Sequence, residues 1–574
     1  MNKPSPINTS NKKFLLVLLA FIVFTLIIVS CNLHKPFNLD EGDFAIAAQR
    51  LKDNPKFFSE DPGGGLWHPP MYIYSLAAAF KIFGESTVAA RGLGFFFYIL
   101  TIIFVSLICK EFFKPEEYRM ISVIAVCLCL INPLMIQFAL LLDIDGGLLT
   151  LLLTVFCYFF ARFYKRGMNI KRMVILGFIF GVSMLAKFTT PPLFVPAVFV
   201  FYFLRRDYKK AFVYSFLLLV IGVAVFWAIW GSYCLLFDVQ PLYPFHVTFG
   251  TKWGQGGFAI NQQKIMLVKS SLLYQWYWVS PAFVMLMVFS IVDRFGHFIK
   301  RKTVDDADFL MILGIGIFLY YFYYFPRQSM MKYQIPLYPL FAIVISRFFY
   351  NVLIKDRRVN IVEIIIICVC AVVTFVYYLF HFPDMVLWLE RGEYAVSDFF
   401  KSNYNLFLKL YFLPFLCLPL LFRSIFEKKS FYFCLVAALW LLTVSTQIVQ
   451  NIKQTEDYTT ANSWHNYGEK GQAQATRYLH EKLSPDGIFI SRKDIGYYLR
   501  ISPQGALTRT YIYNSIFRRP KQEAQAEMEE LMKKHDIEYV QLDKYCDLKN
   551  AFEVLSPYYY LDKQFDDFFV LRKK

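Results

Sequence analysis

The sequence Asn38-Leu39-Asp40-Glu41-Gly42-Asp43 directly follows residues 14–31, an almost wholly apolar run that is long enough to cross a bilayer. Ionisable side chains at the exit of a membrane span are costly unless they line a water-filled cavity. Asp40, Glu41 and Asp43 therefore mark a candidate functional site. A structural alternative is that Asp40 or Asp43 caps the N-terminus of a helix over Phe44–Leu51, which does not exclude a chemical role for Asp40.

The composition is typical of a protein that crosses the membrane many times. Of the 574 residues, 57% are hydrophobic and 19% aromatic, and the mean hydropathy is +0.42. The net charge of +17 does not indicate nucleic-acid binding, because the basic residues form short clusters between apolar runs. Such clusters, here 162–172, 205–210, 300–302, 355–358 and 428–429, are typical of cytoplasmic loops. The positions of the cysteines indicate no disulfide framework.

Apolar windows of spanning length predict about thirteen transmembrane helices. They lie near 14–31, 89–109, 120–141, 147–163, 173–189, 191–204, 211–236, 272–292, 307–325, 333–350, 361–381, 406–425 and 431–449. With a cytoplasmic N-terminus, every basic cluster falls inside, and the long loops 32–88, 237–271 and 382–405 and the tail from 451 fall outside. We therefore predict a polytopic α-helical membrane domain over residues 1–450, with an extracytoplasmic C-terminus.

Two external segments have a predicted structure of their own. The loop 32–88 contains candidate surface helices at Asp43–Leu51 and Pro70–Ile82, and Pro69 and Pro70 suit a helix start. The tail 451–574 is typical of a small soluble α/β domain, with helices at 472–483 and 521–534, a turn at 484–487, and strands at 488–492, 538–542 and 568–572. Because the tail has neither a Gly-rich phosphate loop nor metal-ligand spacing, we predict a cap or docking domain.

Further charged groups lie on the predicted external face. They are Asp143-Ile144-Asp145, Lys187 at the end of an apolar run, and Arg327 with Lys332-Tyr333. Each has a simpler interpretation: the acids as a loop turn, Lys187 as a residue that snorkels to the interface, and Arg327 and Lys332 as flanks of membrane spans. His68 before Pro69-Pro70 has the same alternative of an interfacial side chain.

Acids and bases together on one face favour a particular chemistry. Lys and Arg bind phosphate well, while carboxylates deprotonate a hydroxyl or amine, or hold a divalent metal. A cavity with both signs at the outer leaflet suits transfer of a group from a lipid-linked phosphate. The loop 237–271, with Tyr243 and His246, is a candidate cover for such a cavity.

At these residues the chain resembles the GT-C superfamily of membrane glycosyltransferases, in the bacterial branch of lipid A aminoarabinose transferase and protein O-mannosyltransferases. The matching features are Asp40-Glu41, Trp67-His68-Pro69-Pro70, Phe83-Gly84-Glu85-Ser86, Ala90-Arg91, the acids at 143–145, Gly181 to Lys187, and Lys332-Tyr333 with Pro336 and Pro339. The motifs cover about residues 14–350. Beyond them the resemblance rests on topology and the C-terminal domain.

The resemblance implies a polyprenyl-phosphate sugar donor and Asp40 as the catalytic base, with Glu41, Asp143 and Asp145 as further candidates. We expect the donor phosphate at Arg327 and Lys332, assisted by Lys187, Tyr333 and His68. Several relatives have Lys where this chain has His68, and a neutral imidazole carries no charge, so binding there would depend on pH. His68 could instead ligate a metal, and the sequence leaves metal dependence open.

Other classes of function remain open at the level of sequence. A transporter or flippase also has polar groups around a cavity, but no pair of interrupted helices in matching halves is visible. A polysaccharide polymerase or ligase would use a diphosphate-linked glycan in place of a monosaccharide phosphate. The sequence specifies neither the sugar nor the acceptor, which is an envelope lipid, a glycan or a protein.

Overall fold

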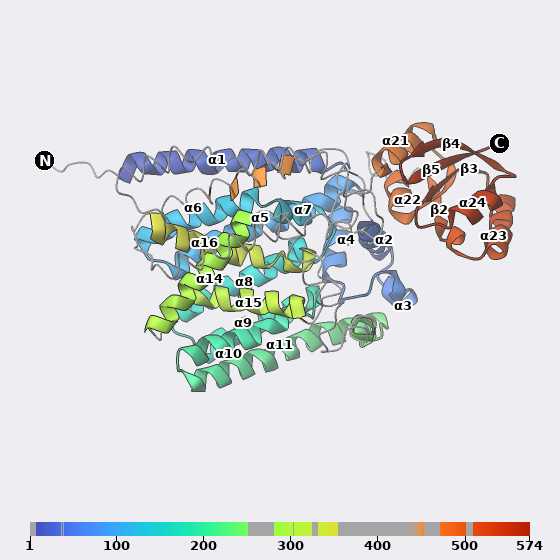
Figure 1. Cartoon of the computed structure of the whole chain (residues 1–574). Helices are drawn as coiled ribbons and strands as arrows, with labels where there is room; N and C mark the ends of the chain where they lie inside the picture. Colours follow the sequence, from blue (N-terminus) through green and yellow to red (C-terminus); the bar gives the residue numbers. More distant parts are fainter. Residues whose placement is uncertain are drawn as a thin grey trace.

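The structure, a computed structural model, is a helical bundle with a small α/β unit at one end (Figure 1). It describes residues 7–35, 37, 39–250, 281–301, 304–323, 331–353, 440, 443–444, 447–448, 451–452, 471–500 and 509–574. The predicted spans 361–381 and 406–425, and most of 431–449, lie outside these residues. So do Arg327 and the side chains of Asp40 and Lys332.

Long apolar runs form the helices of the bundle, which lie side by side in Figure 1. In chain order they are α1 (Ile7–Asn32), α5 (Thr87–Phe112), α6 (Pro115–Ile131), α7 (Pro133–Leu140), α8 (Thr150–Lys165), α9 (Ile170–Ala186), α10 (Phe194–Leu204), α11 (Tyr208–Phe237), α14 (Pro281–Arg301), α15 (Asp308–Tyr323) and α16 (Leu337–Leu353). Each overlaps a predicted span, since a helix satisfies its own backbone polar groups in an apolar environment.

Within the described part of the chain, three helical segments are long and apolar enough to cross a membrane: α5, residues Asp145–Lys165 and α11. The bent pair α6–α7 is a fourth if it forms one span. The helices α10, α15 and α16 and the described apolar part of α1 are shorter. The predicted helical architecture with long apolar helices is therefore confirmed, while the thirteen-span membrane topology stays a prediction.

The predicted span 120–141 is broken at Asn132. The axes of α6 and α7 differ by 60°. Pro133 cannot continue α6, and the Asn132 side chain accepts hydrogen bonds from the backbone amides of Leu134 and Met135 at 3.0 and 3.1 Å, which starts α7 as a new helix. The break brings the end of α7 and the acids that follow it into the protein interior, where Asp143 and Asp145 are buried.

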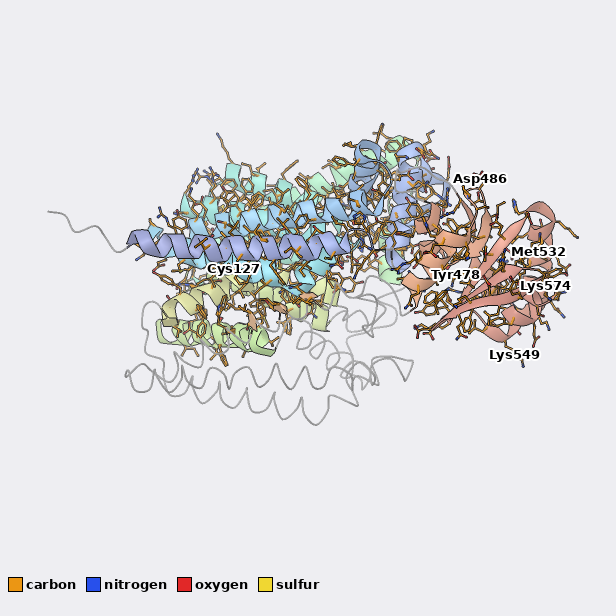
Figure 2. All side chains as sticks on the ribbon, turned by 90° about the horizontal axis from the view of Figure 1, so that it is seen from above. Cys127, Tyr478, Asp486, Met532, Lys549 and Lys574 are labelled. Atoms are coloured by element: carbon orange, nitrogen blue, oxygen red, sulfur yellow. The ribbon has the colours of Figure 1, made fainter. Side chains whose placement is uncertain are left out.

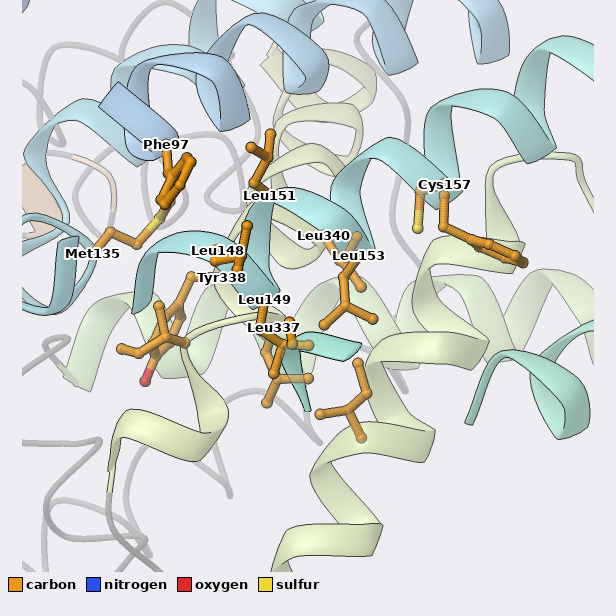
Figure 3. Packing of buried hydrophobic residues seen from close by; sticks show 14 of the residues in the cluster. Phe97, Met135, Leu148, Leu149, Leu151, Leu153, Cys157, Leu337, Tyr338 and Leu340 are labelled. Carbon is orange, nitrogen blue, oxygen red and sulfur yellow. The ribbon is translucent and has the colours of Figure 1, made fainter. Parts of the chain in front are cut away.

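The core of the bundle is tightly packed around this break. In Figure 3, side chains from α5, α7 and α16 meet those of η2 (Asp145–Leu149), a π-helical turn after α7. Gly94 on α5 allows the closest approach, because a Cβ atom there would lie 1.9 Å from the backbone oxygen of Ala139. Gly92, on the same helix, has no atom within 4 Å of such a Cβ.

This contrast gives a paired prediction. We expect Gly94→Ala to lower the free energy of unfolding by about 1–3 kcal/mol, because the neighbouring atom is backbone and cannot rotate away. Gly92→Ala should be neutral or slightly stabilising, since Ala has the higher helix propensity. Thermal unfolding of both variants in the same detergent would test the packing of α5 on α7, and equal midpoints would contradict it.

The loop 32–88, predicted to be external, forms its helices at the end of the bundle opposite the N-terminus (Figure 1). They are α2 (Leu39–Asp53), the short α3 (Phe57–Glu60) and α4 (Met71–Phe83). Both predicted surface helices are present, but α2 begins earlier than expected. Asp40 and Asp43 therefore lie within the helix, and the interpretation of either residue as its cap is wrong. Acidic residues near a helix N-terminus are favoured by the helix dipole.

The C-terminal unit, described as residues 471–500 and 509–574, lies beyond these helices (Figure 1). Its sheet has the order β2-β1-β3-β5-β4, in which β1 pairs in parallel with β2 and β3, and β5 pairs antiparallel with β3 and β4. The strands are β1 (Ile488–Ser491), β2 (Thr510–Tyr513), β3 (Ile537–Asp543), β4 (Tyr559–Phe565) and β5 (Phe568–Lys573), and the helices are α21 (Gln472–Lys482), α22 (Lys493–Arg500), α23 (Lys521–Lys534) and α24 (Leu548–Leu555). The predicted α/β class is confirmed, and α22, α24, β2 and β4 are additions to the prediction.

Candidate active site at one end of the bundle

A buried ion pair fixes the start of α2 to the bundle. The Glu41 carboxylate lies 2.8 Å from Arg91 Nη1 on α5, and both side chains are almost fully buried. Glu41 Oε1 also accepts a hydrogen bond of 3.0 Å from the amide of Leu142. Arg91 donates to the carbonyls of Leu140 and Lys35 at 2.9 and 3.3 Å. The pair thereby ties the end of the first span, α2, α5 and the end of α7 together.

This geometry places Asp40 in the first turn of α2, immediately before the anchored Glu41. The carboxylate of Glu41 is already engaged by a cation and an amide, which suits a positioning role better than proton transfer. The sequence predicts Asp40 as the base. The contacts of the adjacent Glu41 with Arg91 and the amide of Leu142 hold the helix α2 on which Asp40 lies.

The acids after α7 form a second buried group. Asp143 Oδ1 accepts a hydrogen bond of 2.8 Å from the amide of Asp145, so a local turn is present as the simpler interpretation had it. Asp145 also forms an ion pair, in which both of its carboxylate oxygens lie 2.7–2.8 Å from Lys187 Nζ. Lys187 and Asp145 are each only 4% exposed. The snorkelling interpretation of Lys187 is therefore wrong.

Aromatic rings surround the ammonium group of Lys187. Its Nζ lies 4.0 Å from the ring centroid of Tyr333 and 5.6 Å from that of Tyr321, both within the range of a cation–π contact. The two rings stack at 5.3 Å, and the Tyr321 hydroxyl is hydrogen-bonded to that of Thr190. Lys187, Asp145 and Tyr333, from three separated predicted motifs, are therefore brought together.

His68 lies beside this group. Its half-buried ring contacts that of Phe188, the residue after Lys187, with centroids 5.2 Å apart. Phe245, in the short α12 (Tyr243–Phe245), also packs against Phe188, with ring centroids 4.5 Å apart. The start of the loop 237–271 thus covers this region, while its residues from 251 lie outside the described part.

Tyr72 on α4 is a member of the site that sequence reasoning missed. It is 1% exposed and lies within electrostatic range of Asp143, Glu41 and Arg91. Burial raises the pKa of Tyr72 well above its usual range, and the negative charges of Asp143 and Glu41 raise it further. The phenol is therefore protonated at neutral pH. The only sequence signal was its place two residues after Pro70, on the apolar face of a surface helix.

Not all matched motif residues contact the site. Glu85 pairs with Lys52 at the end of α2, and Ser86 caps α5 by accepting a hydrogen bond of 3.1 Å from the amide of Ala89. These residues shape the loop that carries α2 and α4. Within the described residues, no group of three or more His, Cys, Asp or Glu side chains forms a metal site.

An apolar groove of about 410 Å³ lies beside the charged groups, between α4, α9 and α11. It is lined by Pro69, Pro70, Met71, Tyr74, Ser75, Leu185, Ile229, Trp230 and Tyr233. Pro69 adjoins His68, and Leu185 precedes Lys187 by two residues, so two lining residues are close in the chain to the charged groups. The hydroxyls of Tyr74 and Tyr233 lie 3.3 Å apart across it.

Comparison with known proteins agrees with this arrangement. Residues 67–230 match the family described as dolichyl-phosphate-mannose-protein mannosyltransferase. The match includes the Trp67-His68-Pro69-Pro70 motif, the acids at 143–145 and Lys187. No curated protein matches the chain by sequence.

Among solved structures, the fold is that of the GT-C glycosyltransferases, and the resemblance to their aminoarabinose-transferase and protein-mannosyltransferase branch is confirmed. ArnT from Cupriavidus metallidurans bound to undecaprenyl phosphate matches with a TM-score of 0.58 and 14% identity, covering 96% of this chain and 97% of that one. The same protein in its apo state matches with a TM-score of 0.56 and 13% identity over the same shares. The likeness therefore extends beyond the region 67–230 to the whole fold.

Proposed function

We propose that the protein is an integral membrane glycosyltransferase that transfers a sugar from a polyprenyl-phosphate donor to an envelope acceptor, with Asp40 as the base. The observation that carries the proposal is that buried acids and a cation, with Glu41 of α2 bonded to the amide of Leu142 and Asp145 paired with Lys187, accompany an apolar groove lined by Pro69 and Leu185. The site belongs at the external face of a bacterial inner membrane, with the N-terminus of the chain in the cytoplasm.

The groove and the charged groups suit the two parts of such a donor. A polyprenyl chain is apolar and would lie along α4, α9 and α11, next to Trp230 and Tyr233. Its phosphate would then meet His68 and the Lys187 region at the end of the groove, with Lys332 and Arg327 as further cations. The ArnT structure that this fold resembles holds undecaprenyl phosphate, a lipid of this class.

The acceptor loses a proton as its oxygen or nitrogen attacks the sugar, and a carboxylate is the natural proton acceptor. Glu41 and Asp145 are already bound to cations, which favours Asp40 for this step. As the bond from the sugar to the phosphate breaks, negative charge develops on the phosphate, and nearby cations stabilise it. The acceptor is an envelope lipid, a glycan or a protein.

The proposal is tested by incubating the purified protein with a synthetic polyprenyl-phosphate sugar and envelope glycolipids, followed by mass spectrometry. The same glycolipids are compared in cells with and without the gene. A mass increase of one sugar that depends on the protein supports transfer. Use of a diphosphate-linked glycan only would indicate a polymerase or ligase, and donor movement without product would indicate a flippase.

Donor kinetics give a separate prediction for the cations. Charge-assisted contacts contribute about 1.5–3 kcal/mol each. Lys332→Ala or Arg327→Ala should therefore raise the KM for the lipid donor by about 10- to 100-fold and leave the KM for the acceptor nearly unchanged. The measurement is a donor titration in nanodiscs. Unchanged donor dependence in both variants would leave these residues as flanks of membrane spans.

A further inference from the structure

The C-terminal unit contacts the helix that carries Asp40. At Gly42, two residues after Asp40, an added Cβ would lie 3.0 Å from the Cα of Asp494, at the start of α22. A larger residue at this position would force the backbones of α2 and α22 apart by a few tenths of an ångström, so glycine suits this close approach. Tyr497 of α22 reaches further, and its buried ring lies 5.9 Å from that of Phe37, just before α2.

Ionic contacts accompany this close approach. The ammonium group of Lys493 pairs with the carboxylate of Asp43, and the two side chains are 26% and 22% exposed. Such a partly shielded pair is screened by salt less than one at an open surface. Asp43 is the third acid of the motif after the first span, and its partner belongs to the other end of the chain.

Behind this pair, a buried polar network holds Asp494 in place. Arg492 Nε and Nη2 donate to the two carboxylate oxygens of Asp494 at 2.7 and 2.9 Å, and neither side chain is exposed. The amide of Gln472 donates at 3.0 Å both to Asp494 Oδ2 and to the carbonyl of Phe37. Gln472 therefore links the C-terminal unit directly to the backbone that leads into α2.

The network lies at an edge of the sheet that normally binds ligands. Arg492 directly follows β1, and Asp543, 4.0 Å from Arg492, ends the parallel neighbour β3. In open α/β sheets the carboxyl ends of parallel strands form the usual binding crevice. In this chain the crevice receives α2 and the residues before it.

We infer that the C-terminal unit is a positioning element for Asp40, in which Lys493, Asp494 and Gln472 hold α2 on one side while Arg91 holds Glu41 on the other. The inference rests on the proposed function, because it gives a role to the helix of the base. It differs from the view that the unit binds the acceptor. Loss of the contact should lower turnover, because a small displacement of a catalytic group has a large effect on rate.

Docking is tested first without an activity assay. The full-length double variant Asp43→Cys/Lys493→Cys should form a disulfide under mild oxidation in detergent, detected as a cross-linked peptide by mass spectrometry. Asp43→Cys/Lys549→Cys is the matched control, because Lys549 lies on the far side of the C-terminal unit (Figure 2). Absence of the first cross-link would overturn the docking, whatever reaction the protein catalyses.

Activity then tests positioning. In Lys493→Glu, two carboxylates face each other, and we expect kcat to fall by about 10- to 100-fold with little change in the KM for donor or acceptor. The exchanged pair Asp43→Lys/Lys493→Asp should recover most of the loss, and Lys549→Glu should behave as the unchanged protein. A rise in acceptor KM alone would assign the unit to acceptor binding and overturn the inference.

The cross-linked variant completes the test. If α2 works in its docked position, the oxidised Asp43→Cys/Lys493→Cys protein keeps its turnover, and reduction changes it little. If oxidation abolishes turnover and reduction restores it, the unit must leave α2 during the reaction, which overturns a fixed positioning role. Should the cross-link form in a protein that transfers no sugar at all, the proposed function fails while the docking stands.

Discussion

Asp40→Asn is expected to lower kcat at least ~10²-fold, with normal expression and an unchanged thermal midpoint. Asparagine keeps the shape of the side chain but cannot accept the proton of the acceptor group. Asp53→Asn is the matched control, because Asp53 ends the same helix and its side chain is 69% exposed. Turnover is measured with a polyprenyl-phosphate sugar in nanodiscs, and near-normal turnover of Asp40→Asn would contradict the assignment of the base.

The other candidate acids are tested in parallel. Asp145→Asn leaves the buried ammonium of Lys187 without its counter-ion, so we expect a loss of thermal stability together with a loss of activity. The pattern for Asp40→Asn, a loss of activity alone, is therefore distinct. If Asp143→Asn shows that pattern and Asp40→Asn does not, Asp143 is the base.

The second large effect is expected on stability. Arg91→Met removes the partner of the buried Glu41 carboxylate and should lower the free energy of unfolding by about 3–5 kcal/mol. In Arg91→Met/Glu41→Gln the buried charge is gone as well, and part of the stability should return. The measurement is unfolding in detergent by denaturant or heat, with both variants compared at equal protein concentration.

An exposed ion pair between Arg50 on α2 and Asp61, the residue after α3, provides the control. Arg50 lies 3.4 Å from Asp61, and the two side chains are 56% and 49% exposed, so Arg50→Met should change stability by less than about 1 kcal/mol. If Arg91→Met and Arg50→Met have equal effects, the Glu41–Arg91 pair is not the anchor of α2 that its geometry indicates.

Much of the fold follows from local pattern. The helices α5, α11 and α16 lie where apolar runs predict them, because a helix that faces the protein on one side and lipid on the other needs apolar residues on both. The predicted span 120–141 is an exception. Its apolar residues form a continuous run, but Pro133 divides it into the two helices α6 and α7. In the C-terminal unit, α22 was missed because Lys493–Arg500 is short, and its position depends on tertiary contacts: Ile495 and Leu499 pack into the core of the unit, and Tyr497 contacts Phe37.

The sequence predicted which charged residues belong to the site, but not which of them form ion pairs with one another. The acids and cations stood out because charge is rare beside membrane spans. Which cation meets which acid depends on how distant helices pack, so the pairing of Lys187 with Asp145, 42 residues apart, could not be read from the chain. Tyr72 carried no signal that separates it from an ordinary buried aromatic residue.

The hydrogen bond from Gln472 to the carbonyl of Phe37 joins residues 435 positions apart. During synthesis, the first span and α2 leave the ribosome long before α21 and α22 exist. The surroundings of Asp40 can be completed only after the last portion of the chain has been synthesised and folded. If the C-terminal unit positions Asp40 as we propose, activity appears only at the end of biogenesis, and a chain that stops before residue 472 would form its helices yet remain an inactive precursor.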